Sequence, residues 1–157
     1  MSVSRTRDVL GLTAFVALCF GVSVLGGRAT VPALTEWYPA LRKPSWTPPG
    51  WVFGPVWTLL YSLMAVAGWM AWREGRARFG PLLFLLQLAL NAAWPWLFFG
   101  QRRLDLALVC IAALWVAILC TTVAFWRSSR GAAILLVPYL AWVGFAAALN
   151  HAIWRLN

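Results

Sequence analysis

Charged residues divide this chain into five long uncharged stretches. After trimming at prolines, each stretch runs for about 19–24 residues, the length at which a helix crosses a hydrocarbon core of about 30 Å. The stretches cover residues 9–27, 51–72, 79–101, 106–126 and 131–154. Strands of a membrane barrel would be shorter and would alternate with polar positions. The pattern therefore predicts an all-α integral membrane protein, a bundle of five transmembrane helices in a single domain over residues 1–157.

The composition favours an outer surface that faces lipid. Hydrophobic residues make up 62% of the 157 residues, and only 11% are charged, which is too few to cover a soluble domain. The net charge is +9, but the basic residues stand in small groups at the ends of the apolar stretches. Arginine in such places reaches the lipid headgroups, so we exclude a nucleic-acid partner.

The sequence says less about targeting and orientation. Arg5 and Arg7 precede the first stretch, as in a signal peptide, but its apolar run is longer and no A-x-A cleavage site follows. We therefore expect a retained helix in a multi-pass membrane protein. Basic residues are shared almost equally between the two sides, so the sequence fixes neither the orientation nor the membrane.

One connection, residues 28–50, is much longer than the others. A long loop in a compact bundle is usually functional or disordered, and its aromatic residues Trp37, Tyr38 and Trp46 argue against disorder. Its prolines restrict the backbone further. We expect a structured cap over one end of the bundle.

Polar side chains gather on one face of the third stretch. Gln87, Asn91, Trp94 and Phe98 recur at helical spacing, and Pro95 cannot donate a hydrogen bond to the carbonyl of Asn91. One interpretation is a helix–helix hydrogen bond at Asn91 with an ordinary proline kink. The other is a ligand site, because a broken helix is tolerated where it borders a cavity. This stretch alone does not decide between them.

Two further aromatic stripes favour the ligand-site interpretation. The second stretch carries Phe53, Trp57, Tyr61, Met64 and Gly68, and the fifth carries Tyr139, Trp142, Ala146 and Asn150. Counted from the loop side, key positions of the three stripes lie about 9–18 Å deep. Stripes from three helices thus reach one level beneath the loop. The sequence predicts a capped pocket there, lined by Phe53, Trp57, Tyr61, Asn91, Trp94, Trp142 and Ala146.

Tryptophan is unusually frequent, with 12 in the chain. Trp57, Trp94 and Trp142 lie deeper than an interfacial belt, and each indole offers a flat face and one donor for a planar ring. We therefore expect a flat apolar ligand such as a porphyrin, with no cofactor required. Arg42 and Lys43 either meet the propionates of such a ligand or form a basic pair at the membrane surface.

Few residues suggest other chemistry. His151, the only histidine, is expected at the interface rather than on a haem iron. Cys19, Cys110 and Cys120 lack metal-ligand spacing, so we predict no metal site. No acid–base pair or nucleophile triad suggests a dark or hydrolytic reaction, and the chain is expected to be a binding protein rather than an enzyme.

Three segments resemble the translocator protein family, also called tryptophan-rich sensory proteins or peripheral benzodiazepine receptors. They are residues 37–61, with the specific run K-P-S-W-T-P-P, together with residues 87–99 and 138–150. The resemblance implies a homodimer of five-helix protomers that binds porphyrins, benzodiazepine-type drugs and sterols. It places Tyr38 in the pocket with Trp57, Tyr61, Asn91, Trp94, Trp142 and Ala146. His151 replaces the tyrosine of the family's sterol pattern, so sterol binding is doubtful.

Three functions remain open. The first is binding, transport or sensing of porphyrins such as protoporphyrin IX or haem. The second, proposed for members of this family, is light-dependent porphyrin degradation, in which Trp57 and Trp142 would donate electrons. The third is a membrane scaffold whose pocket holds lipid. Small-residue pairs, Ala89 with Ala93 and Gly144 with Ala148, are candidate helix-packing positions for the dimer.

Overall fold

Five long helices run the length of the molecule. The computed structural model describes residues 2–75 and 79–157, with helices α1 (Ser2–Ala33), α3 (Gly50–Glu74), α4 (Gly80–Pro95), α5 (Leu104–Trp126) and α6 (Arg130–Leu156). A π-helical turn, η1 (Trp96–Gly100), continues α4, and the short α2 (Trp37–Ala40) lies in the first loop. With η1 counted as part of α4, five helices in the described chain are long and apolar enough to cross a membrane. The predicted all-α, five-helix integral membrane fold is confirmed.

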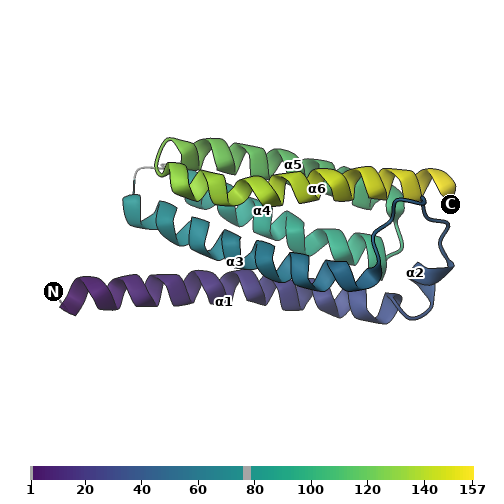
Figure 1. The fold of residues 1–157 in the computed structure, drawn as a ribbon, viewed down its shortest axis with the longest axis horizontal. Helices are drawn as coiled ribbons and strands as arrows, with labels where there is room; N and C mark the ends of the chain where they lie inside the picture. Colours follow the sequence, from purple (N-terminus) through teal and green to yellow (C-terminus); the bar gives the residue numbers. More distant parts are fainter. Residues whose placement is uncertain (1, 76–78) are drawn as a thin grey trace.

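The helices form a bundle with the loop at one end. Helix α5 packs against α4 and α6, while α1 packs against α3 and α4 at the edge of the bundle. The loop that carries α2 lies at the same end as the C-terminus, and the N-terminus lies at the opposite end (Figure 1). This arrangement places one end of α1, α3, α4 and α6 beneath the loop.

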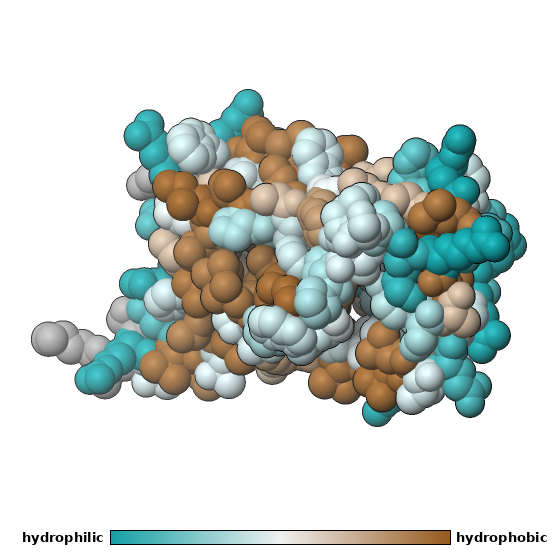
Figure 2. All heavy atoms as spheres, turned by 45° about the vertical axis from the view of Figure 1, so that its right-hand side comes forward, coloured by the Kyte–Doolittle hydropathy of each residue, from teal (hydrophilic) through white to brown (hydrophobic). Residues whose placement is uncertain are grey.

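The surface has the polarity expected of a membrane protein. Charged side chains gather toward the two ends of the molecule, and apolar side chains cover much of the region between them (Figure 2). Leu82, Val109 and Ile134 are 67%, 68% and 56% exposed, which would be costly in water but is favourable against acyl chains.

The first helix is longer than predicted, and the loop is shorter. Residues 9–27 were expected to be helical, but α1 extends from Ser2 to Ala33, so that only the later part of residues 28–50 forms the loop. Arg28 bounds the uncharged stretch, yet a charged residue does not end a helix that continues into the headgroup region. Pro32 lies in the last turn, where the Thr35 hydroxyl donates to its carbonyl at 2.9 Å.

The third stretch changes its helical form after Pro95. Pro95 has no N–H to donate, and the chain continues from Trp96 as a π-helical turn, closed by a 2.7 Å hydrogen bond from the Gln101 N–H to the Trp96 carbonyl. The expected span 79–101 is therefore two elements, α4 and η1. The wider turn brings Phe98 and Phe99 against Tyr38 of α2, with ring centroids 6.4 and 5.6 Å away.

Candidate functional site

A cavity of about 850 Å³ lies at the loop end of the bundle, with walls from α1, the loop, α3, α4, η1, α5 and α6. This volume falls within the range of small-molecule sites, which is about 300–1,000 Å³. Aromatic, aliphatic and glycine residues form most of the wall. The cavity is thus large enough for a sizeable apolar ligand.

The structure brings all of the sequence-predicted site residues to this one cavity. They come from four elements: Tyr38 from α2; Phe53, Trp57 and Tyr61 from α3; Asn91 and Trp94 from α4; Trp142 and Ala146 from α6. Phe98 and Asn150 also line the cavity, whereas Gln87, Met64, Gly68 and Tyr139 are buried in the core away from its wall. Contact of these residues with a ligand stays a prediction.

Asn91 joins three helices at the cavity wall. Its Oδ1 accepts a hydrogen bond from the Tyr61 hydroxyl at 2.6 Å, and its Nδ2 donates to the Tyr139 hydroxyl at 2.7 Å. Asn91 is 3% exposed, so these bonds form in an apolar setting where unpaired groups are costly. Asn91 thus makes the helix–helix hydrogen bonds of the first interpretation. It also lines the cavity, but its contact with a ligand stays a prediction.

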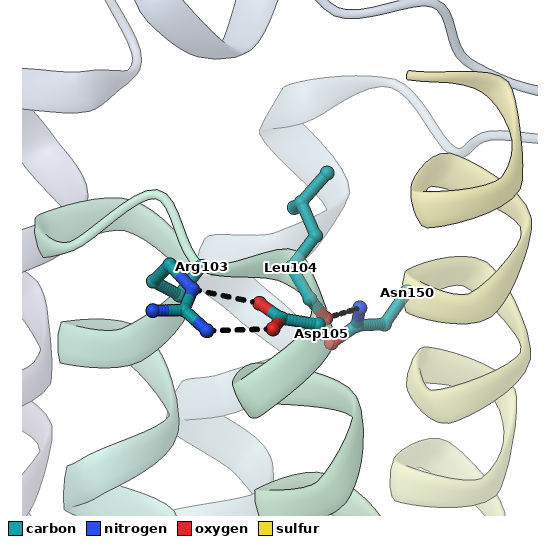
Figure 3. A network of polar contacts seen from close by, with 4 residues as sticks. All are labelled: Arg103, Leu104, Asp105 and Asn150. Carbon is teal, nitrogen blue, oxygen red and sulfur yellow. Dashed lines mark hydrogen bonds and ion pairs between the residues drawn. The ribbon is translucent and has the colours of Figure 1, made fainter.

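A second network fixes the indole of Trp94. The Trp94 Nε1–H donates to Asn150 Oδ1 at 3.1 Å, and Asn150 Nδ2 donates to the Leu104 carbonyl at 3.0 Å. Asn150 of α6 therefore bridges α4 and the first residue of α5. Figure 3 shows its bond to the Leu104 carbonyl. Beside it, the exposed Arg103 and Asp105 form a two-bond ion pair with a shortest distance of 2.7 Å (Figure 3).

Trp142 differs from Trp94 in the hydrogen bonding of its indole N–H. The Trp142 ring packs edge-on against Phe53, with centroids 5.9 Å apart, and lies 5.4 Å from Phe145. Its Nε1 is buried, and no acceptor for it lies among the described residues. An unpaired buried donor costs about 1–3 kcal/mol.

The loop is fastened across the end of the cavity. The Lys43 ammonium donates to the carbonyls of Tyr38, Pro39 and Leu41 at 2.7, 3.1 and 3.0 Å, and lies 4.8 Å from the Tyr38 ring centroid. Because the ammonium has three protons, these carbonyls satisfy its donors. Lys43 lies on the cavity wall, but these bonds favour a structural role over an anion contact. Burial raises the pKa of the Tyr38 hydroxyl.

The backbone of Arg42, rather than its side chain, forms hydrogen bonds that hold the loop. Its N–H donates to Asn157 Oδ1, and its carbonyl accepts from Asn157 Nδ2, both at 3.0 Å. Arg42 is exposed and is absent from the described cavity wall. The end of the chain therefore holds the loop in place, and the sequence gives no pattern that pairs residues this far apart.

Sequence reasoning missed the contribution of α1. Ser23, Gly26, Gly27 and Thr30 line the cavity. They recur at positions i, i+3, i+4 and i+7, and this small-residue stripe was the signal that could have revealed a cavity wall. His151 is exposed, packs near Trp154, and is absent from the described cavity wall. Within residues 2–75 and 79–157, no three His, Cys, Asp or Glu side chains group as metal ligands would.

Comparison with known proteins agrees with the resemblance noted in the sequence. Residues 15–155 match the profile of the TspO/MBR family. The chain is 41% identical over 156 residues to the tryptophan-rich protein TspO of Chlorobaculum tepidum, covering 96% of this chain and 98% of that protein. It is 48% identical over 154 residues to the human translocator protein, covering 94% and 89%. It is 40% identical over 147 residues to the tryptophan-rich sensory protein of Cereibacter sphaeroides, covering 91% and 89%. With its five membrane-spanning helices and this match across nearly its whole length, the chain belongs to the TspO/MBR family.

Proposed function

We propose that the cavity binds porphyrins and other flat apolar molecules within the membrane, and that the protein carries or senses them. The observation that carries this proposal is the wall itself. Trp57, Trp94 and Trp142 converge on a space of about 850 Å³. Indole rings stack well on planar aromatic ligands. The names of the relatives, translocator and sensory protein, agree with transport or sensing.

Binding is tested by quenching of tryptophan fluorescence by protoporphyrin IX in the dark, with empty liposomes as the blank. We expect saturable quenching at low micromolar concentration or tighter. Trp142→Phe removes a donor and part of the stacking surface, so affinity should fall by about 2- to 10-fold. Trp126→Phe is the matched control, because Trp126 is 51% exposed and absent from the described cavity wall. Quenching that matches the liposome blank would indicate that the cavity holds lipid and does not bind porphyrin.

Light-dependent degradation is the second candidate. It is favoured by the packing of Trp57 against two phenols, with centroids 5.6 Å from Tyr61 and 6.3 Å from Tyr139. Electron donors of this kind beside a photoexcited ring would yield radicals that oxygen can trap. Under illumination, a degrading protein would bleach bound porphyrin and form a new absorbing product. Changing both Trp57 and Trp142 to Phe would then abolish bleaching while retaining much of the binding, whereas a carrier would lose affinity alone.

A further inference from the structure

The end of the cavity is closed by several independent contacts. Lys43 ties three loop carbonyls together, and Asn157 pairs with both backbone groups of Arg42. Trp46 of the loop packs edge-on against Phe145 of α6, with centroids 5.7 Å apart. The Lys43 bonds stiffen the loop, and a ligand that passed through this end would have to break the two Arg42–Asn157 bonds and separate aromatic contacts.

The side of the cavity between α1 and α3 is open instead. The lining residues contributed by α4, η1, α5 and α6 are all buried or half-buried. On α1 and α3, by contrast, several lining residues are exposed: Val31 of α1 by 66%, Trp51 at the start of α3 by 76%, and, further along α3, Gly54 and Thr58. Residues that line a cavity and also reach the outer surface mark its opening. Gly54 and Thr58 lie inside the membrane-spanning part of α3, so the opening extends from the loop end into the region of the acyl chains.

Two glycines keep this side open. A Cβ added at Gly27 of α1 or Gly54 of α3 would meet no described atom within 4 Å, and both residues line the cavity. The neighbouring Gly26 is different, because a Cβ there would lie 3.2 Å from Pro95, a tight contact. Gly27 and Gly54 are therefore not required by helix packing, and their missing side chains leave space at the edge of the cavity.

The opening also presents little polarity to a lipid. The Thr58 hydroxyl donates to the Gly54 carbonyl at 2.9 Å, and the Thr30 hydroxyl donates to the Gly26 carbonyl at 3.0 Å. The polar groups of these threonines are thus satisfied by their own helices. The space-filling view shows a hollow toward the loop end of the molecule, bordered largely by apolar and weakly polar side chains (Figure 2).

We propose that ligands enter and leave the cavity sideways, from the bilayer, through the opening between α1 and α3 whose edges are set by Gly27 and Gly54. This inference rests on the proposed function for its ligand, and it narrows the ligand class. Molecules that dissolve in the acyl chains reach the cavity directly, whereas polar molecules confined to water do not.

The route is tested by stopped-flow quenching with protoporphyrin IX already dissolved in the liposomes. Gly27→Leu and Gly54→Leu place side chains in the opening without a clash and with improved helix propensity, so both should fold. We expect each to slow association and dissociation about tenfold or more, with a much smaller change in Kd. Gly21→Leu is the matched control, because Gly21 also faces open space on α1 but is absent from the described cavity wall.

Asn157→Ala tests the alternative route through the loop end, because it frees the loop and leaves the side opening unchanged. The proposal expects its rates to stay within about twofold of those of the parent protein. Faster exchange in Asn157→Ala, together with unchanged rates in both glycine variants, would overturn the proposal in favour of passage through the loop end.

A second measurement does not depend on porphyrin. A spin label at Thr58→Cys, in a Cys120→Ser background, reports whether the opening meets lipid or water, because Thr58 is exposed and lines the cavity. We expect strong relaxation by oxygen and weak relaxation by a water-soluble nickel chelate, as for the same label at Val109→Cys, an exposed residue of α5. Strong relaxation by the chelate at residue 58 alone would refute a lipid-facing opening. Failure of porphyrin binding with a lipid-like label would instead refute the proposed function.

Discussion

At the scale of single residues, two buried side-chain amides on α4 differ in their hydrogen bonding. Asn91 is hydrogen-bonded on both sides, to Tyr61 and Tyr139. Gln87, one turn earlier and 1% exposed, has no partner for either side-chain atom within the described chain. The same residue chemistry therefore stabilises the bundle at one position and costs free energy at the other, because the partner groups are present at only one of them.

We predict that Asn91→Leu lowers the free energy of unfolding by about 1–3 kcal/mol, because two buried phenols lose their partner. Gln87→Leu is the matched comparison and should be neutral or stabilising, since it removes two unsatisfied polar atoms. Thermal unfolding in detergent measures both variants. Equal destabilisation would show that Gln87 has acquired partners, such as bound water, and would contradict this explanation.

At the scale of elements, glycines serve α1 and α3 in two ways. A Cβ at Gly68 of α3 would lie 2.8 Å from Phe15 and 2.9 Å from Phe84, so the missing side chain lets α1 and α4 approach α3. Phe15 and Phe84 themselves pack edge to face at 5.7 Å. Gly27 and Gly54, by contrast, border open space. Close packing thus holds the half of α1 far from the loop, while the cavity lies beside the other half.

We expect Gly68→Ala to destabilise the protein by about 1–3 kcal/mol, because the added methyl overpacks against two rings. Gly27→Ala should be neutral or slightly stabilising, since alanine is the better helix former and nothing obstructs it. The thermal midpoints of the two variants provide the measurement. A Gly68→Ala protein as stable as the parent would mean that Phe15 and Phe84 move aside at no cost.

Asn157, the residue that follows α6, holds the loop to the bundle. Asn157 bonds both backbone groups of Arg42, so Asn157→Ala should expose the Arg42 amide to exchange. We predict hydrogen–deuterium exchange at residues 41–43 at least several-fold faster than in the parent, with no change within α5. Trp154→Ala, at an exposed position on the same helix, is the control. Unchanged exchange would show that other contacts, such as Trp46 against Phe145, hold the loop without Asn157.

At the scale of the whole molecule, the homodimer implied by the resemblance stays a prediction. Of the two small-residue pairs, Gly144 is already used within the protomer, since a Cβ there would lie 3.2 Å from Trp115 Nε1. Ala89 is exposed on α4, so it is the better position for a partner subunit. We expect Ala89→Leu to shift a dimer toward monomer in native mass measurements, with Val109→Ala, at an exposed position on α5, as control.

The sequence by itself determined the fold class and most of the predicted site. Spans about 20 residues long are defined by bilayer thickness, and helical periodicity placed Trp57, Asn91 and Trp142 at one depth without any knowledge of packing. These are local or one-dimensional constraints. Tyr38 needed the family resemblance, because no periodicity extends into the proline-rich loop.

Tertiary structure alone decided the partners and the opening. The bonds of Asn91 to Tyr139, of Trp94 to Asn150 and of Asn157 to Arg42 join residues 48, 56 and 115 positions apart, and no local pattern encodes such pairs. The role of Gly27 could not be inferred from the sequence either. A helical glycine gives the same sequence pattern whether its face packs against another helix or borders empty space. Only the packing of α1 against α3 and α4 distinguishes Gly27 from Gly26 and Gly68, since it determines which faces are covered.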